Sequence, residues 1–493
     1  MSRIAAPEWP CQTAYSRPVE KESAHVVLKE KLSRRGFLKA NSMALGAQLL
    51  FIPKQTKANN ARQPNVLMIL SDQESQVFEE EAGAVLRLPN RKLLERQSIR
   101  LTQAFVVAPQ CSASRSAVMT GLYPHEAGVV TNVDESSLGR ALSPIVPTLG
   151  KVFRSHGYTT AYLGKWHLTN GLGGGVSPDH DHDALRPFGF DHYHYASDAR
   201  GHGQLVEATA DWIRSGPSSP WLLIVSFPFS PHDITRAAKL IPSIQVRPGI
   251  ELPPNFDDDL RTKPRPQEEF LQDGPGKASL DWGKEDWLRY RSYYLDLIER
   301  TDGYLGTILG ALRRRSDAED TIVVYTSDHG DMGGAHHLPF KGPFMYDELL
   351  RVPLLISYPR RFRAPVVSDS MVSNVDLAPT LAALSGIEWP RPLPGKDFSL
   401  LFDHPKAIIR TEIFAEYYGA GHWVNPIRTI RTAEWKYNLY VAPGREIAAE
   451  MYDLKRDPGE VHNIANLPTY RNVRQSLAQN LLEWRRNTKD PLL

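Results

Sequence analysis

Four short apolar runs in this chain end abruptly at polar residues, and this pattern constrains the fold more than any other feature. The runs are residues 65–70, 159–163, 221–227 and 321–326. Because their apolar residues are continuous and do not alternate with polar ones, they predict strands that are buried on both faces. The sequence therefore predicts an α/β fold with a large, mostly parallel β-sheet flanked by helices.

Helices are expected between these strands, at residues 93–97, 112–120, 146–156, 205–215, 287–314 and 375–384. In sheets of this kind, ligands bind outside the carboxyl ends of the strands. Each of the four predicted strands is followed by polar residues that could carry chemistry. We therefore expect these residues to lie in one site.

The character of the chain changes after about residue 386. Prolines at 390, 392 and 394 resemble a linker, and short strands separated by turns are expected at residues 427–431, 435–440 and 450–454. A helix over residues 473–486 would follow them. We expect a main α/β domain at 61–386 and a smaller C-terminal subdomain, an antiparallel sheet plus a helix, at 387–493.

The first sixty residues are predicted to be a targeting signal and linker. Residues 33–39 read SRRGFLK, and a polar-diluted apolar stretch follows at residues 40–52. This stretch is too short for a stable membrane span, which needs about 20 apolar residues. The SRRxFLK string resembles a twin-arginine export signal. We expect the bacterial twin-arginine machinery to export the chain to the periplasm or medium, although a basic amphipathic helix in a folded domain is the alternative.

Charge and cysteine content narrow the function. A net charge of +2 predicts neither nucleic-acid binding nor attachment to anionic membranes. The chain has two cysteines, Cys11 and Cys111, and removal of the leader would leave Cys111 without a disulfide partner. A lone cysteine is more often an inert buried thiol than a reactive one, so its neighbours decide between the two interpretations.

Two of the strand ends offer metal ligands. Asp72 and Gln73 follow the first run, and Asp328 and His329 follow the last. Carboxylate and amide oxygens suit Ca²⁺, Mg²⁺ or Mn²⁺, and the imidazole favours Mn²⁺. Either pair alone would more often be a turn or a helix cap than a metal site.

Cys111 lies at the start of a predicted helix that Gly121 ends. The free N–H groups and the dipole of a helix N-terminus favour an anion there, and Arg115 lies one turn further along the same face. Cations and proton-transfer groups at other strand ends or loops are Lys165, His167, His232 and Lys341. Together these residues predict a site for a tetrahedral, highly charged group, a sulfate or phosphate ester.

The string CSASR at residues 111–115 resembles the sulfatase signature, which is Cys or Ser, any residue, Pro or Ala, any residue, and Arg. Further family motifs follow in order at residues 121–125, 164–168, 327–331, 341–342, 435–437, 452–454 and 457–460. The similarity runs from about residue 63 to the end. The chain therefore resembles the formylglycine-dependent sulfatases of the alkaline-phosphatase-like superfamily, with a catalytic domain at 61–386.

The resemblance implies that a maturation enzyme oxidises Cys111 to formylglycine, whose hydrate attacks the sulfur atom of the substrate. It also implies a divalent metal ion held by residue 111 together with Asp72, Gln73, Asp328 and His329. This ion would lower the pKa of the attacking hydroxyl and neutralise charge on the sulfate.

The remaining roles also follow from the resemblance. Arg115 and Lys165 would hold the formylglycine and the sulfate. His232 and Lys341 would bind the sulfate near the leaving oxygen, with His232 as the proton donor. His167 would remove a proton from the remaining hydroxyl, so that sulfate leaves and the aldehyde is restored.

Two departures from the family pattern matter. Many sulfatases have Asp-Asp at the first ligand pair and Asp-Asn at the second, whereas Gln73 and His329 make this site resemble choline sulfatases and phosphonate or phosphate ester hydrolases. The ion is expected to be Ca²⁺, with Mn²⁺ and Mg²⁺ as alternatives. Ala113 replaces proline, which suggests an anaerobic radical-type maturase.

The expected activity is hydrolysis of a sulfate ester, with a sulfated saccharide as the substrate class because export is typical of glycan-degrading sulfatases. The alternatives are a phosphonate monoester or phosphodiester hydrolase of the same fold and a non-catalytic sulfoglycan-binding protein. The segments 171–183 and 417–423 could face a substrate; a solvated insertion and burial between domains are the respective alternatives.

Overall fold

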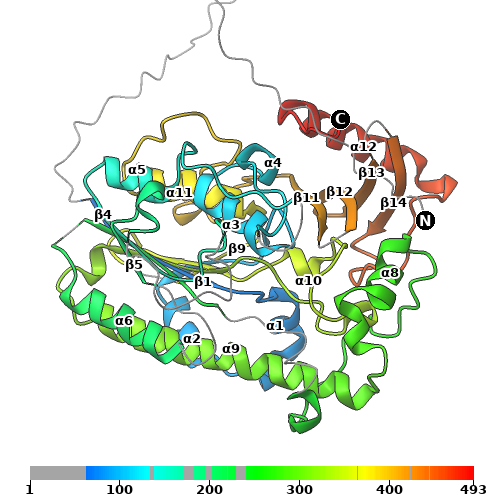
Figure 1. Cartoon of the computed structure of the whole chain (residues 1–493), viewed down its shortest axis with the longest axis horizontal. Helices are drawn as coiled ribbons and strands as arrows, with labels where there is room; N and C mark the ends of the chain where they lie inside the picture. Colours follow the sequence, from blue (N-terminus) through cyan, green and yellow to red (C-terminus); the bar gives the residue numbers. More distant parts are fainter. Residues whose placement is uncertain are drawn as a thin grey trace, which may run out of the picture. The chain divides into compact units, whose positions relative to one another are not determined.

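A mostly parallel sheet of eight strands forms the centre of the fold, in the order β5-β4-β6-β1-β7-β8-β2-β9 (Figure 1). The strands are β1 (Asn65–Ser71), β2 (Ser98–Leu101), β4 (Thr159–Gly164), β5 (His192–His194), β6 (Trp221–Ser226), β7 (Thr321–Ser327), β8 (Leu354–Ser357) and β9 (Val366–Ser368). Only β8 runs antiparallel to its neighbours within the described sheet. The predicted fold class is confirmed, and β4, β6, β1 and β7, the four strands expected from the sequence, lie side by side in the sheet.

The computed structural model describes residues 63–133, 138–170, 183–194, 202–218, 220–228, 240–362, 365–420, 423–442 and 445–493. All of them belong to one unit that spans Arg62–Leu493. The predicted export signal at residues 1–60 and the candidate His232 lie outside the described residues. Their roles remain predictions.

Helices cover both faces of the central sheet (Figure 1). The helices are α1 (Gln76–Ala82), α2 (Pro89–Glu95), α3 (Cys111–Thr120), α4 (Pro124–Ala127), α5 (Leu149–Ser155), α6 (His202–Ser215), α8 (Arg265–Asp273), α9 (Lys284–Leu312), α10 (Asp347–Leu350), α11 (Leu377–Leu384) and α12 (Arg471–Asn487). Helices α3, α5 and α11 pack on one face and α2, α6 and α9 on the other. The central strands are therefore buried on both sides, as their continuous apolar sequences predict.

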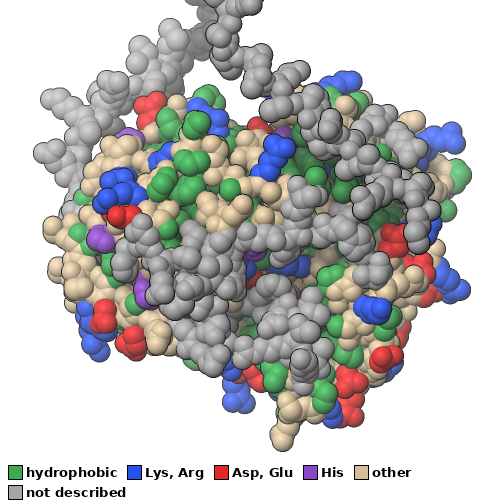
Figure 2. All heavy atoms as spheres, viewed as in Figure 1, with side chains coloured by type: hydrophobic (Ala, Val, Ile, Leu, Met, Phe, Trp, Pro, Cys, Tyr) green, Lys and Arg blue, Asp and Glu red, His purple; other side chains and the backbone are tan. Residues whose placement is uncertain are grey.

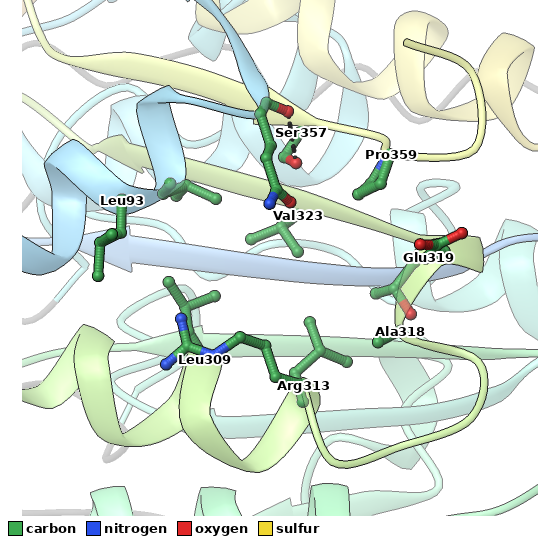
Figure 3. Close-up of a pocket in the computed structure, with 12 residues that line it drawn as sticks. Leu93, Leu309, Arg313, Ala318, Glu319, Val323, Ser357 and Pro359 are labelled. Atoms are coloured by element: carbon green, nitrogen blue, oxygen red, sulfur yellow. Dashed lines mark hydrogen bonds between the residues drawn. The ribbon is translucent and has the colours of Figure 1, made fainter. Parts of the chain in front are cut away.

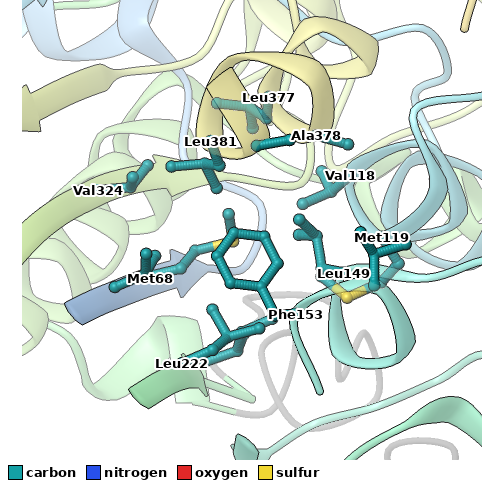
Figure 4. Packing of buried hydrophobic residues seen from close by; sticks show 14 of the residues in the cluster. Met68, Val118, Met119, Leu149, Phe153, Leu222, Val324, Leu377, Ala378 and Leu381 are labelled. Atoms are coloured by element: carbon teal, nitrogen blue, oxygen red, sulfur yellow. The ribbon is translucent and has the colours of Figure 1, made fainter. Parts of the chain in front are cut away.

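Alternate side chains of the central strands enter two different cores. Met68, Leu222 and Val324 point toward α3, α5 and α11, where they pack with Phe153 and Leu381 (Figure 4). The residues that alternate with them pack against α2, α6 and α9. This division follows from the two-residue period of a strand.

A groove of about 450 Å³ lies on the α9 face of the sheet (Figure 3). Leu93, Leu309 and Val323 form its apolar walls, with Arg313 beside them. The groove also reaches Thr321, the first residue of β7. It therefore lies at the amino end of this strand, away from the carboxyl end where the candidate residues follow.

A second, antiparallel sheet follows in the C-terminal part of the chain, in the order β11-β12-β13-β14. Its strands are β11 (Glu412–Ala420), β12 (Trp423–Thr432), β13 (Trp435–Ala442) and β14 (Arg445–Asp453). The predicted antiparallel sheet with a closing helix, α12, is confirmed; β11 was not predicted. This sheet and α12 share an apolar core with Ala117 of α3, so the helix that begins at Cys111 lies between the two sheets. The domain boundary near residue 386 remains a prediction.

Charges on the face drawn in Figure 2 are mixed, with Lys and Arg side chains interspersed among Asp and Glu. Within the described part of the chain, every helix is too short or too polar to cross a bilayer.

Candidate active site

Side chains from three elements meet at the carboxyl end of the central sheet. Asp72 follows β1, Cys111 begins α3, and Asp328 and His329 follow β7. One potential ligand atom from each of these four residues lies within 4.8 Å of the others, and all four residues are buried. Because the last residues of β1 and β7 pair in parallel register, the residues after them are necessarily close.

Cys111 lies at the N-terminus of α3, as predicted. The preceding residue, Gln110, is extended, and the helix ends at Gly121, whose φ of 69° is left-handed. The N–H of Ser112 donates to the Asn132 side-chain oxygen at 3.0 Å. This helix terminus therefore offers fewer free N–H groups to an anion than the sequence alone predicts, since Asn132 already satisfies one of them.

Two lysine ammonium groups and one histidine ring nitrogen surround the Cys111 sulfur. Its Sγ lies 2.8 Å from Lys341 Nζ, 3.4 Å from Lys165 Nζ and 3.2 Å from His329 Nε2. Burial disfavours the thiolate, but the charges of Lys165 and then Lys341 outweigh it and hold the pKa of Cys111 well below its usual value. The His167 side chain adds a hydrogen bond that lowers the pKa further. An anionic group at position 111 is thus stabilised.

Arg115 connects the two carboxylates of the cluster. Its Nε donates to Asp328 Oδ2 at 2.7 Å, and one terminal nitrogen lies 3.2 Å from Asp72 Oδ2. The other donates to Ser226 Oγ at 2.6 Å and to the Lys165 carbonyl at 2.8 Å. Burial opposes the charge, but Asp328 and Asp72 raise the pKa of Arg115 above its usual value. The guanidinium therefore holds the Asp72 and Asp328 carboxylates in place.

Lys165 also pairs with Asp72, since its Nζ lies 2.6 Å from Asp72 Oδ2. Burial raises the pKa of Asp72, but Lys165, together with Arg115 and Lys341, outweighs this effect and holds the pKa below its usual value. The side chains of Asp72, Asp328, Arg115, Lys165 and Lys341 carry two negative and three positive charges. Apart from residue 111, the excess is one positive charge, which an anionic group at that position balances.

The two nitrogens of His329 have different roles. Nδ1 lies 2.9 Å from the Gly330 carbonyl oxygen, so this nitrogen carries the hydrogen. Nε2 is then an acceptor, and Lys341 Nζ lies 2.9 Å from it. This tautomer turns a lone pair toward Cys111, the arrangement that a metal-binding histidine requires.

Gln73 is held by hydrogen bonds at both its backbone and its side chain. Its φ of 63° is left-handed, and its N–H donates to Asp328 Oδ1 at 3.0 Å. Its Nε2 donates to Asp331 Oδ2 at 2.5 Å. Burial is the main cause that raises the pKa of Asp331, to about 6.

These residues fit a divalent cation. Asp72 and Asp328 supply carboxylates and His329 an unprotonated ring nitrogen beside residue 111. Gln73, which follows Asp72 and donates its N–H to Asp328, would add an amide oxygen. Hard cations such as Ca²⁺, Mg²⁺ and Mn²⁺ take such oxygen-rich sets.

Of the remaining predicted groups, the structure describes His167 and part of the segment 417–423. The His167 side chain is buried close to Cys111, and its Nδ1 has no hydrogen-bond partner among the described residues. His232 and most of the segment 171–183 lie outside the described residues. Tyr417 and Tyr418 are buried, which favours packing over stacking on a ligand for this part of the segment 417–423.

Three supporting residues have no role that the sequence predicts. Ser226 orients Arg115, Asn132 accepts a hydrogen bond from the Ser112 N–H, and Asp331 binds Gln73. The positions of Ser226 at the end of an apolar run and of Asp331 in the string SDHGD were available signals. Asn132 lies in a loop and has no comparable signal.

Comparisons with known proteins agree with this geometry. A family model described as Sulfatase matches residues 64–387, and one described as N-sulphoglucosamine sulphohydrolase, C-terminal, matches residues 334–487. The chain is 29% identical to the uncharacterized sulfatase YidJ of Escherichia coli (strain K12) over 470 residues, which cover 87% of this chain and 88% of that protein.

Two solved structures are similar to the described fold. A 2-O GAG sulfatase has a TM-score of 0.74 and 25% identity, with 87% of this chain and 93% of that chain covered. A phosphonate monoester hydrolase of Agrobacterium radiobacter has a TM-score of 0.69 and 21% identity, with 86% and 96% covered. The second likeness concerns the fold alone.

Proposed function

The chain belongs to the sulfatase family and is a sulfuric ester hydrolase, and we propose that it hydrolyses a sulfate ester of a saccharide with formylglycine at position 111. One observation carries this proposal. Cys111 is buried among potential metal-ligating atoms of Asp72, Asp328 and His329 and is flanked by lysine ammonium groups. A buried cysteine with a purely structural role packs as a small apolar residue and does not require charged side chains around its sulfur.

A divalent ion would be held by residue 111, Asp72, Gln73, Asp328 and His329, with Ca²⁺ as the first choice. Bound there, it would supply Lewis acidity to the attacking hydroxyl and to the sulfate oxygens.

The protein's own side chains would orient the reacting groups. Arg115 fixes both carboxylates through direct hydrogen bonds. Lys165 and Lys341 approach residue 111 from two positions and would bind the oxygens of the sulfate, where negative charge develops. Because Lys341 now donates to His329 Nε2, a cation that takes this nitrogen requires the ammonium to move off it.

Proton transfer would be divided between two histidines. His167 lies within hydrogen-bonding reach of residue 111 and would accept the proton whose loss releases sulfate and restores the aldehyde. His232 would donate a proton to the leaving oxygen, a role carried over from the family motif.

A sulfated saccharide is the proposed substrate class because a structural neighbour at 25% identity is described as a 2-O GAG sulfatase. The string SRRGFLK supports twin-arginine export to the periplasm or medium. A formylglycine-generating maturase would then act on Cys111 before export.

A phosphonate monoester hydrolase is the second candidate. Gln73 and His329 replace the acidic and amide residues that many sulfatases have, and the fold of a phosphonate monoester hydrolase is similar. A phosphonate monoester carries one negative charge, as a sulfate monoester does, so the lysines at this site would bind either ester.

The test compares rates on an aryl sulfate, an aryl phosphonate monoester and a panel of sulfated sugars, using protein matured in a host with formylglycine-generating activity. The proposal expects the highest kcat/KM on a sulfate ester. Cys111→Ala, the control for contaminating hydrolases, should lose at least about 10³-fold in rate because the nucleophile is gone. A preference for the phosphonate would reject the sulfate assignment. Binding of a sulfated glycan without hydrolysis would reject the proposed catalytic activity.

A further inference from the structure

Asp331 accepts hydrogen bonds from three donors at once. Its Oδ2 accepts from Gln73 Nε2 at 2.5 Å, and both carboxylate oxygens lie 2.9 Å from the Tyr290 hydroxyl. Its Oδ1 also accepts the Gly333 N–H at 2.7 Å. The carboxylate is completely buried and lies outside the proposed metal-ligand set.

This arrangement fixes which end of the Gln73 amide faces Asp331. A glutamine side chain has a donor end and an acceptor end, whereas a carboxylate only accepts. With donors arriving from Gln73, Tyr290 and Gly333, Asp331 acts as an acceptor toward each of them. The NH₂ group of Gln73 must therefore face Asp331, and the oxygen Oε1 is the end that would coordinate a cation.

Helix α9 supports the backbone of Gln73 as well. The Tyr294 hydroxyl donates to the Gln73 carbonyl oxygen at 2.6 Å and accepts from the Ser75 N–H at 2.9 Å. Tyr290 and Tyr294 are four residues apart and so lie on the same face of α9. One helix face thus holds the left-handed backbone of Gln73 through Tyr294 and its amide through Tyr290 and Asp331.

We propose that Asp331, held by Tyr290, is a positioning residue that turns the amide oxygen of Gln73 toward the metal ion. The inference rests on the proposed metal site and deepens it. It also gives a physical reason for glutamine at position 73, because a carboxylate there would face the buried Asp331 carboxylate without an intervening donor. Two carboxylates in one buried site repel each other.

The proposal predicts opposite effects for single and double substitutions. In Asp331→Asn, the Asn oxygen would still accept from Tyr290 and Gly333, so its NH₂ group would face Gln73. The Gln73 amide would then have to turn and present its own NH₂ group to the metal. In Gln73→Glu with Asp331→Asn, the Asn NH₂ group would donate to one Glu oxygen and leave the other for the metal.

The experiment measures the dissociation constants of Ca²⁺ and of Mn²⁺ by calorimetry on chelator-treated full-length protein. Asp331→Asn should weaken binding by about 10- to 100-fold, the usual effect of losing a support of a metal ligand. Gln73→Glu alone should also weaken binding. The double variant should regain most of the lost affinity, which a purely structural role for Asp331 does not predict.

Asp320→Asn is the matched control, because it changes a buried carboxylate at the opposite end of β7 and should leave metal affinity unchanged. If Asp331→Asn fails to fold, Tyr290→Phe serves in its place and should weaken binding by a few-fold with the fold retained. Unchanged affinity in both variants, or no recovery in the double variant, overturns the positioning role. Absence of metal binding by the unsubstituted protein instead overturns the metal site itself.

Discussion

His125 connects three separate parts of the described fold through one imidazole. Its Nδ1 lies 2.7 Å from Glu416 of β11, and its Nε2 lies 3.0 Å from the carbonyl oxygen of Thr488, the residue after α12. Burial lowers the pKa of His125, but Glu416 outweighs it and raises the pKa to about 9. The ring is therefore charged in the folded protein at neutral pH.

This shift predicts how stability depends on pH. Because the folded pKa lies above the usual value near 6.5, the stabilisation is fully present below about pH 6.5 and is lost as pH rises through about 9. We expect His125→Gln to lower the free energy of unfolding by roughly 2 kcal/mol at pH 6 and by much less at pH 9.5. Urea unfolding of both proteins across this range measures the difference.

His462→Gln is the control, because His462 is exposed and its loss should change stability little at any pH. A difference between the unsubstituted protein and His125→Gln that stays constant from pH 6 to 9.5 would contradict the charged pair with Glu416.

Individual site residues could be predicted from sequence to the extent that strand ends position them. Asp72 and Asp328 follow strands that pair in register, so their proximity follows from the order of the strands. The partners of Arg115 could not be predicted, because Ser226 comes from a third strand and its hydroxyl is one of many polar groups near strand ends. Such contacts depend on side-chain packing, which a single sequence does not encode locally.

At the scale of elements, the close approach of β4 and β6 positions Lys165. Gly164 ends β4 with a φ of 101°, and a Cβ on it would lie 1.9 Å from the Ser226 carbonyl oxygen. The N–H of Lys165 donates to this same oxygen at 2.9 Å. Any side chain at position 164 would separate the two strands and displace Lys165 from the site.

Gly164→Ala should therefore lower the free energy of unfolding by more than the strain of its left-handed backbone alone explains. Gly157→Ala is the matched control, since Gly157 also has a positive φ, 86°, but has open space around its Cβ position. We expect a loss of about 1–2 kcal/mol for the control from backbone strain and a further 1–3 kcal/mol for Gly164→Ala from overpacking. Denaturant unfolding measures both, and equal losses would contradict the steric account.

Elements could be predicted from sequence where burial is continuous. The four central strands and α9 were expected within a few residues of their observed ends. The strands β2, β8 and β9 were missed because they are short and lie toward one edge of the sheet. The aromatic residues of β11 are also typical of a binding segment, so the sequence does not predict the strand; in the structure they pack in cores beneath the C-terminal sheet.

At the scale of the whole described unit, α3 is the element on which both sheets converge. Every residue of α3 is buried, because Val118 packs on the central sheet side and Ala117 on the side of the C-terminal sheet. The serines of α3 donate hydrogen bonds to backbone carbonyl oxygens, as Ser112 does to that of His167 at 2.6 Å. The proposed nucleophile is thus fixed by a helix that cannot shift without disturbing two cores.

The central claim is that residue 111 works as an aldehyde and not as a thiol. Mass spectrometry of the tryptic peptide 101–115, from protein made with and without a formylglycine-generating maturase, tests it most directly, with aryl sulfatase rates measured on the same samples. We predict that the rate rises in proportion to the fraction of this peptide that carries the aldehyde. Full activity from protein in which residue 111 is entirely unmodified cysteine would contradict the account.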